Sequence, residues 1–559
     1  MDIAILAFLP ILIAAVLMVG LRLSAKIVMP IVFITTVAIA VGGWQLSTAH
    51  IFASIIQGFV VTLDILYVIF GAILLLNLLK FSGGIDVIRG SFSKISEDRR
   101  VQVIIIVWLF GSFLEGAAGF GTPAAIVAPL LLALGFPTAT AVMLGMMVQS
   151  TAVTFGALGT PILIGVASGL QSAEFNSHLL DHGIGAPHYL HVVGAQAAIV
   201  HALVGTLMPT LMIAMMTRFF GVRKSWKEGL TIWRFSLFAG LCFTIPYVLT
   251  AIYLGPEFPS LMGSLVGLPT VMYAAKKGFL LPDTKWDFPV RASWPEEWMG
   301  HVSVNSNENN ISPKISLFNA WLPYVFLAVL LVVSRLSYLG LGDRLKALKF
   351  QWDNLLDTSI SASTTPLYLP GTFLIIAGIL VIVLHRMTRS GVIGAVSESF
   401  KITISAGFVL LFTVPMVRIY INSGLNESGL ESMPILMAGW VAGAVENIYP
   451  IFASTIGALG AFIAGSNTVS NLMFSLFQFG VAQNLGIPTH LLVSLGAVGA
   501  AAGNMIAIHN VVAACAAVGY FGKEGNILRL TLLPTLYYLM AVGFIGWLLT
   551  TVFVPTIPY

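Results

Sequence analysis

One carboxylate, three glycines and a Thr-Pro pair stand together at residues 113–123, which read Phe-Leu-Glu-Gly-Ala-Ala-Gly-Phe-Gly-Thr-Pro. Apolar runs flank this stretch on both sides. A carboxylate at the centre of a membrane helix costs roughly 2.5–3.5 kcal/mol, and burial favours the protonated form of such a group. Glu115 is therefore the leading candidate for a side chain that carries a proton. The alternative is a structural role, as an acceptor for unpaired backbone N–H groups.

Two Gly-Thr-Pro triplets predict helix starts close to this carboxylate. Thr122-Pro123 has the order of an N-cap residue followed by proline in the first turn, and Gly159-Thr160-Pro161 repeats that order. Helix N-termini favour small anions, and glycines allow close approach of a ligand to the backbone. This half of the chain therefore offers substrate-binding candidates at Gly116, Gly119, Gly121, Thr122 and Thr160. The competing interpretation is that glycine and proline only kink membrane helices for packing.

A second set of polar residues interrupts the apolar sequence nearer the C-terminus. Short hydroxyl and amide side chains bind a carboxylate or a 2-hydroxyl group without a buried fixed charge, and we assign them to substrate: Ser466, Asn467, Thr468 and Asn504. Asp64 and His509 join Glu115 as candidates for proton coupling, with a hydrogen-bonded structural role as the alternative for Asp64. His191 and His201 stand open between proton relay and packing. For Arg418 we expect a side chain that reaches the membrane interface, with attraction of an anion as the alternative.

The amino-acid composition restricts the chain to one class, that of membrane proteins. Of the 559 residues, 58% are hydrophobic and only 9% are charged, whereas a soluble protein carries roughly 25% charged residues. Apolar runs long enough to cross a bilayer follow one another, which predicts an all-α polytopic membrane protein with about 12 transmembrane helices. The two cysteines form no metal spacing, and no phosphate loop, paired catalytic carboxylates or nucleophile elbow is present. We therefore expect no catalytic residues, no cofactor, no metal and no nucleic-acid partner.

The distribution of basic residues predicts the topology. Most Lys and Arg residues fall in loops that alternate with an acidic loop free of them at 169–187, and the positive-inside rule then places both termini outside. The basic loop 335–349 argues against this scheme. The limbs 102–115 and 123–134 would span only about 21 Å and about 18 Å as helices. Together with the charge rule, this predicts that 102–134 is a re-entrant hairpin whose tip is buried in protein or lines a cavity.

Short matches in order indicate an internal repeat. Leu134-Gly135-Phe136-Pro137-Thr138 returns as Leu485-Gly486-Ile487-Pro488-Thr489, and Leu144-Gly145 returns as Leu495-Gly496 at the same offset. The predicted spans between them make the offset an odd number of crossings, so the repeats have inverted topology. We predict a first repeat at 1–217 with the hairpin 102–134, linking spans and a cytoplasmic loop at 218–316, and a second repeat at 317–559 with the hairpin 450–485.

The 113–123 motif, with Leu-Gly-Phe-Pro at 134–137 and Gly-Ala-Leu-Gly-Thr-Pro at 156–161, closely resembles the bacterial lactate permease family. The resemblance implies secondary transport of L-lactate, D-lactate or glycolate across the bacterial inner membrane, coupled to protons. A looser similarity links Ser466-Asn467-Thr468 to the hairpin tips of divalent-anion/sodium symporters, which are dimers with inverted repeats and an elevator motion. Here Glu115-Gly116-Ala117 stands where the first tip of those proteins has Ser-Asn-Thr, which favours protons over sodium.

Our hypothesis is a transporter, not an enzyme. It performs proton symport of small 2-hydroxymonocarboxylates, has an elevator-type fold, and has membrane lipid and a second copy of the chain as further partners. Two alternatives stay open: a sodium-coupled di- or tricarboxylate carrier, and a membrane subunit of a larger complex with no transport of its own.

Overall fold

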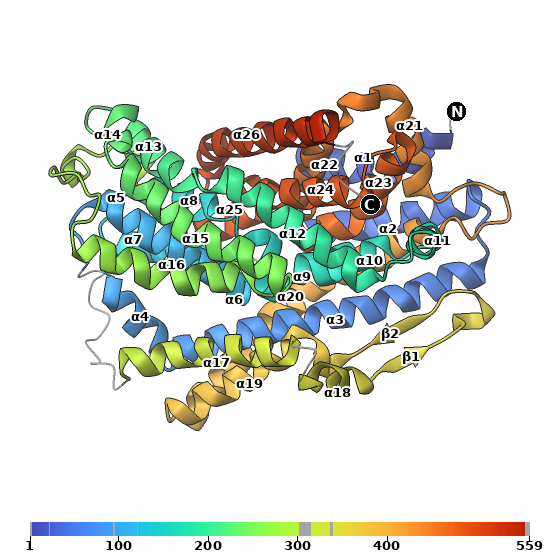
Figure 1. Ribbon diagram of the computed structural model, residues 1–559, viewed down its shortest axis with the longest axis horizontal. Coiled ribbons are helices and arrows are strands. Elements are labelled where there is room, and N and C mark those ends of the chain that lie inside the picture. The colour runs from blue at the N-terminus through green and yellow to red at the C-terminus, as the bar shows by residue number, and fades with distance from the viewer. Residues whose placement is uncertain are drawn as a thin grey trace.

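The computed structural model describes residues 3–21, 23–92, 95–119, 121–300, 315–335 and 339–553, and within these ranges the elements are almost all helices (Figure 1). The helices of the first part are α1 (Ile3–Ala15), α2 (Ala25–Gly42), α3 (Thr48–Phe81), α4 (Gly84–Phe92), α5 (Arg99–Gln102), α6 (Gly111–Ala118), α7 (Thr122–Ala133), α8 (Thr138–Met147), α9 (Gly156–Thr160), α10 (Ala167–Leu170), α11 (Ala173–Asp181), α12 (Ala186–Gly205), α13 (Met208–Phe220), α14 (Trp226–Leu230), α15 (Trp233–Tyr253) and α16 (Pro259–Lys276).

The second part continues with α17 (Leu317–Arg335), α18 (Leu341–Ala347), α19 (Pro370–Leu384), α20 (Arg389–Asn422), α21 (Met433–Val445), α22 (Tyr449–Ala464), α23 (Asn467–Leu485), α24 (Thr489–Gly503), α25 (Ile508–Ala517) and α26 (Glu524–Leu548). The prediction of an all-α chain misses one element. Strands β1 (Phe350–Trp352) and β2 (Ala362–Thr364) pair antiparallel, with Gln351 opposite Ser363, and the pair packs on α3. Each strand has only three residues, too few to leave an alternating pattern in the sequence.

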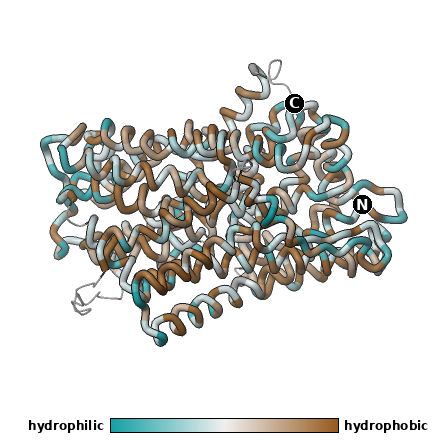
Figure 2. The backbone as a smooth tube through the Cα atoms, turned by 60° about the horizontal axis from the view of Figure 1, so that its bottom comes forward, coloured by the Kyte–Doolittle hydropathy of each residue, from teal (hydrophilic) through white to brown (hydrophobic). Residues whose placement is uncertain are grey.

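The described residues include 11 helices that are long and apolar enough to cross a membrane. Hydrophilic segments gather toward the two ends of the long axis, and mostly apolar helices run between them (Figure 2). The class predicted from composition, a polytopic membrane protein, is confirmed, with slightly fewer long spans than expected. The predicted spans 3–21 and 369–386 contain helices shorter than a bilayer requires, Ile3–Met18 and Pro370–Leu384.

Two helices of 34 residues each, α3 and α20, pack along one another and make the most extensive contact among the described helices (Figure 1). α19 packs against α3, and α2 packs against α20. Close backbone contact requires small residues here: a Cβ on Gly58 would lie 2.5 Å from the Cα of Pro415, and a Cβ on Gly71 would lie 2.8 Å from the carbonyl oxygen of Gly371. These contacts tie both halves of the chain into one helical layer.

A helix, a break and a second helix occupy residues 99–133. The first helix is continuous from Arg99 to Ala118, with 20 residues through α5, η2 (Val103–Phe110) and α6. The predicted limb 102–115 is therefore too short at both ends, and, contrary to the prediction, the helix that contains it is long enough to cross a bilayer. The guanidinium of Arg99 donates a hydrogen bond of 2.6 Å to the carbonyl of Leu134, so the segment returns to the place where it began.

The second broken segment has the same plan. α22 ends at Ala464 and is followed by Gly465, which has φ 67; α23 begins at Asn467 and packs back against α22. The Tyr449 hydroxyl donates to Oε1 of Gln478 at 2.9 Å, and Nε2 of Gln478 donates to the carbonyl of Ala453 at 3.0 Å. These bonds join the two helices close to the start of α22. The break lies where the polar residues of the sequence predict it.

Candidate functional site

Four helix starts meet where these breaks lie. α7 begins at Thr122, η4 (Pro161–Val166) at Pro161, α23 at Asn467 and α25 at Ile508. The contacts cross between the two halves of the chain: α7 packs on α25, and α23 packs on η4 and α10. Nδ2 of Asn471 donates to the carbonyl of Pro161 at 3.0 Å. Helix starts present free N–H groups and positive partial charge, so this meeting point suits an anion.

Glu115 lies at this meeting point. Its side chain is buried, and none of the described residues donates a hydrogen bond to its Oε2. A Cβ on Gly156 would lie 2.5 Å from Oε1 of Glu115, so a larger residue there would force the carboxyl group to shift. An unpaired buried carboxylate is costly, whereas a carboxyl group that holds a proton or meets a ligand is not. The position therefore fits a group that exchanges a proton or contacts a substrate.

The chain next to Glu115 takes an unusual backbone path. Ala157, Leu158 and Gly159 follow one another with φ of 42, 57 and 78. A left-handed conformation costs roughly 1–2 kcal/mol for a residue with a side chain, so α9 is a left-handed turn that the surrounding packing holds in place. Gly119, itself at φ 62, packs on it, because a Cβ there would lie 2.9 Å from Ala157. Strain of this kind often marks a functional site.

The two Gly-Thr-Pro triplets do start helices, but neither threonine caps its helix as predicted. Gly121, at φ 77, is the cap of α7, and the Thr122 hydroxyl donates back to the carbonyl of Gly119. Thr160 has helical dihedral angles, and its hydroxyl donates to the carbonyl of Ala157 at 2.6 Å. Both threonines brace the turn before their helix, which leaves the first N–H groups of each helix without a side-chain cap.

Gly121 meets an amide of the other half of the chain. A Cβ there would lie 2.9 Å from Oδ1 of Asn510, and Nδ2 of Asn510 donates to Oε1 of Gln149 at 3.1 Å. Nε2 of Gln149 donates in turn to the carbonyl of Gly121 at 3.5 Å. One hydrogen-bonded cluster therefore joins the break between α6 and α7, the broken segment after α8 and the start of α25.

The second break contributes Ser466, Asn467 and Thr468. The Ser466 hydroxyl caps α23 by accepting from the N–H of Val469 at 3.5 Å. Thr468 packs its backbone against η4, where a Cβ on Gly165 would lie 2.7 Å from the Thr468 carbonyl oxygen. Asn467 and Asn504 are both buried, and the Oδ1 atom of each lacks a hydrogen-bond partner among the described residues.

The other residues predicted from the sequence lie away from these clusters or have a role that differs from the predicted one. Asp64 is half-buried on α3, and its Oδ1 accepts from the Thr364 hydroxyl of β2 at 2.5 Å. Gly116 packs against α16, where a Cβ would lie 2.7 Å from the backbone nitrogen of Leu261. The side chain of His509 lies outside the described residues. Arg418 does not reach an interface as expected: it is buried and donates to Oε1 of Gln57 and to the carbonyls of Ser168 and Gln171.

The sequence prediction did not include Thr154 or Tyr538, which lie around the break after α8, and left the role of His201 open. Thr154 of η3 (Val153–Phe155) bonds His201 of α12, and His201 bonds Tyr538 of α26. The sequence held one signal for them: Gln149, Ser150, Thr151 and Thr154 interrupt an otherwise apolar span. The contact between His201 and Tyr538, separated by 337 positions, has no such signal.

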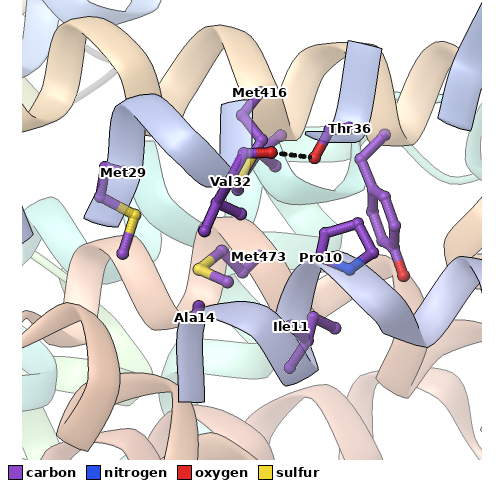
Figure 3. Close-up of a pocket in the computed structure, with 10 residues that line it drawn as sticks. Pro10, Ile11, Ala14, Met29, Val32, Thr36, Met416 and Met473 are labelled. Atoms are coloured by element: carbon purple, nitrogen blue, oxygen red, sulfur yellow. Dashed lines mark hydrogen bonds between the residues drawn. The ribbon is translucent and has the colours of Figure 1, made fainter. Parts of the chain in front are cut away.

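An apolar cavity lies away from these clusters. Its volume is only about 20 Å³, and α1, α2, α20 and α23 line it with Met29, Met416 and Met473 among others (Figure 3). The one hydrogen bond drawn there runs within α2, from the Thr36 hydroxyl to the carbonyl of Val32 at 2.8 Å. Such a space holds about one water molecule and offers nothing to a carboxylate.

Fold and site together define a multi-pass membrane protein with a buried polar centre built from broken helices. The family model described as L-lactate permease matches residues 3–553. The glycolate permease GlcA of Escherichia coli K12 is 30% identical, over 98% of this chain and 96% of its own. The L-lactate permease of the same organism is 28% identical over 99% and 97%. That of Bacillus subtilis 168 is 29% identical over 89% and 86%.

The chain belongs to the L-lactate permease family and is a transporter, not an enzyme. The solved structure of the YdaH transporter of Alcanivorax borkumensis aligns with 86% of this chain and 84% of its own at 15% identity. Its TM-score of 0.40 is too low to support an argument about the fold.

Proposed function

We propose that the chain carries small 2-hydroxymonocarboxylates across the bacterial inner membrane in symport with protons. The substrates are L-lactate and, in addition, D-lactate and glycolate. The names of its relatives support this substrate class, because glycolate and lactate share a carboxylate with a hydroxyl group on the neighbouring carbon. Recognition then needs a site for a small anion and a partner for one hydroxyl group.

One observation supports proton coupling above the others: Glu115 is buried at the meeting of the broken helices and its Oε2 has no described partner. A carboxyl group in this position is neutral when it holds a proton and repels an anionic substrate when it does not. Substrate and proton therefore enter together. Asp64 and His509 are secondary candidates, and Asp64 already accepts a hydrogen bond from Thr364.

The substrate carboxylate binds where the helix starts converge. Gly119 and Gly121 bring the backbone of the first break close to the ligand, and Gly116 lets α6 approach α16. Hydroxyl and amide groups complete the proposed site: Thr122, Thr160, Ser466, Asn467, Thr468 and Asn504. A site of this composition binds an anion without a fixed positive charge, so the empty site is not left with an unpaired cation.

Reciprocal packing supports inverted repeats at 1–217 and 317–559, joined by 218–316. α3 and α20 have equal length, α2 packs on α20 as α19 packs on α3, and α7 packs on α25 as α23 packs on η4. The two broken segments are re-entrant hairpins in this proposal, and their helices move against the α3 and α20 layer in an elevator motion of a homodimer.

Loop contacts support the proposed orientation. Arg99 pairs with Asp287 at 2.9 Å, and Arg100 donates to the carbonyls of Glu228 and Thr284, so three loops predicted to be cytoplasmic lie together. With this end inside, both termini lie outside.

Counterflow in proteoliposomes tests the substrate class independently of coupling. Vesicles loaded with unlabelled L-lactate should take up labelled L-lactate, D-lactate and glycolate, and should not take up succinate or citrate. In vesicles loaded with succinate or citrate, exchange of that acid alone would favour the alternative carrier. No exchange of any acid by the purified single chain would favour a subunit without transport activity.

A further inference from the structure

The proposed function leaves one buried imidazole unexplained. His201 of α12 has no exposed surface. Its Nε2 lies 2.7 Å from the Thr154 hydroxyl, and its Nδ1 lies 2.6 Å from the Tyr538 hydroxyl of α26. Tyr538 in turn lies 3.0 Å from the Thr151 hydroxyl. Both ring nitrogens therefore have hydroxyl partners, and the chain of bonds reaches the break beside Glu115.

The partners of Thr154 determine the direction of these bonds. The carbonyl of Ala497 can only accept, so the Thr154 hydroxyl donates to it at 3.3 Å. Nδ2 of Asn467 can only donate, and it lies 3.5 Å from Thr154 Oγ1. Thr154 then has one lone pair left, so Nε2 of His201 carries the hydrogen and donates. Nδ1 of His201 accepts from Tyr538, which accepts from Thr151.

This assignment leaves one polar atom of the cluster unused. Oδ1 of Asn467 is buried and has no hydrogen-bond partner among the described residues. A buried acceptor without a donor is costly, and a carboxylate offers no donor to it. The hydroxyl group of a 2-hydroxy acid does offer one.

We propose that Oδ1 of Asn467 accepts the 2-hydroxyl of the substrate, and that His201 is a positioning residue that holds Asn467 through Thr154. The inference rests on the proposed function, and it adds the contact that separates hydroxy acids from other small monocarboxylates. Propionate has no donor at this carbon, and neither does pyruvate. Both acids leave Oδ1 unpaired and bind more weakly than lactate.

Two substitutions of equal polarity test this role. In His201→Gln the side-chain amide reaches the place of Nε2 and still donates to Thr154. In His201→Asn the amide reaches only the place of Nδ1, so the contact with Tyr538 is kept and the contact with Thr154 is lost. His191→Asn on the same helix is the matched control, because His191 bonds the carbonyls of Ala251 and Ile252 instead.

The measurement is competition by unlabelled lactate, propionate and pyruvate against lactate counterflow in proteoliposomes. We expect the intact chain to prefer lactate over propionate by about tenfold or more. His201→Asn should lower this preference about tenfold through weaker lactate binding, while His201→Gln and His191→Asn keep it within about twofold.

Three results would overturn the inference: a wild-type chain without preference for lactate, an unchanged preference in His201→Asn, or an equal loss in His201→Gln and His201→Asn. A wild-type chain that exchanges no monocarboxylate would overturn the proposed function and the inference with it. An active wild type with an unchanged His201→Asn overturns the inference alone. If His201→Asn does not fold, Thr154→Val removes the same link to Asn467 and should give the same loss of preference.

Discussion

The guanidinium of Arg99 donates a hydrogen bond of 2.6 Å to the backbone carbonyl of Leu134, and so joins the two ends of the first broken segment. The ring of Phe136 packs against the same guanidinium, with 5.3 Å between its centroid and Cζ of Arg99. A segment that crossed the membrane once would separate these residues by the thickness of a bilayer. Their contact is the strongest geometric support for the proposed re-entrant hairpin.

Cysteine labelling tests this hairpin. Single cysteines at Glu97 and Ala133, both exposed, should react with an impermeant maleimide from the same side of oriented vesicles. Asp181→Cys, exposed in α11, should react from the opposite side and serves as the control. Cys242 and Cys515 are replaced by serine in all three chains. Labelling of positions 97 and 133 from opposite sides would contradict the hairpin.

Gly156→Ala should lower transport although the protein still folds. Gly156 has φ −64, which alanine adopts freely, so the only obstacle is the contact of its new Cβ with Oε1 of Glu115. Overpacking of this kind costs about 1–3 kcal/mol, and we expect counterflow to fall at least about tenfold. Gly443→Ala, where nothing lies within 4 Å of the added Cβ, is the control. Full activity of Gly156→Ala would show that the carboxyl group does not need this space.

Glu115→Gln should separate exchange from coupling. The amide keeps the shape of the carboxyl group but does not bind or release a proton at physiological pH, so uptake driven by a pH gradient should fall to the level without a gradient. Lactate counterflow should persist, because exchange requires no net proton movement. Glu398→Gln, a half-exposed partner of Lys80, is the control. Driven uptake that survives in Glu115→Gln would remove this residue from the coupling mechanism.

Arg418→Met should destabilise the protein. The arginine joins α20 to the end of α10 through bonds of 2.8 Å to Ser168 and 3.1 Å to Gln171, and to Gln57 through a bond of 2.7 Å. Hydrogen bonds to a charged group contribute about 1.5–3 kcal/mol each, so thermal unfolding in detergent should begin at a clearly lower temperature. Lys401→Met, exposed on the same helix, should leave the unfolding temperature unchanged. Equal unfolding temperatures for both variants would contradict the structural role of Arg418.

Local patterns predicted the class of protein and the positions of both breaks, because apolar length, glycine and Ser-Asn-Thr are visible in short windows. The predicted bounds of the first helix in the broken segment 99–133 were wrong, because Arg99 and Arg100 look like loop residues. In the structure Arg100 is buried, and its Nη2 pairs with Asp98 at 2.7 Å. The left-handed path of Ala157 and Leu158 was not predictable, because neither residue favours it. Likewise, Thr154, His201 and Tyr538 meet only through tertiary packing.

Accumulation of labelled L-lactate in proteoliposomes under an inward proton gradient tests the central claim most directly. The purified chain should concentrate lactate several-fold above the vesicles without a gradient, a protonophore should abolish the effect, and replacement of sodium by choline should not change it. Uptake that is the same with and without the proton gradient, or that disappears when choline replaces sodium, would contradict proton symport.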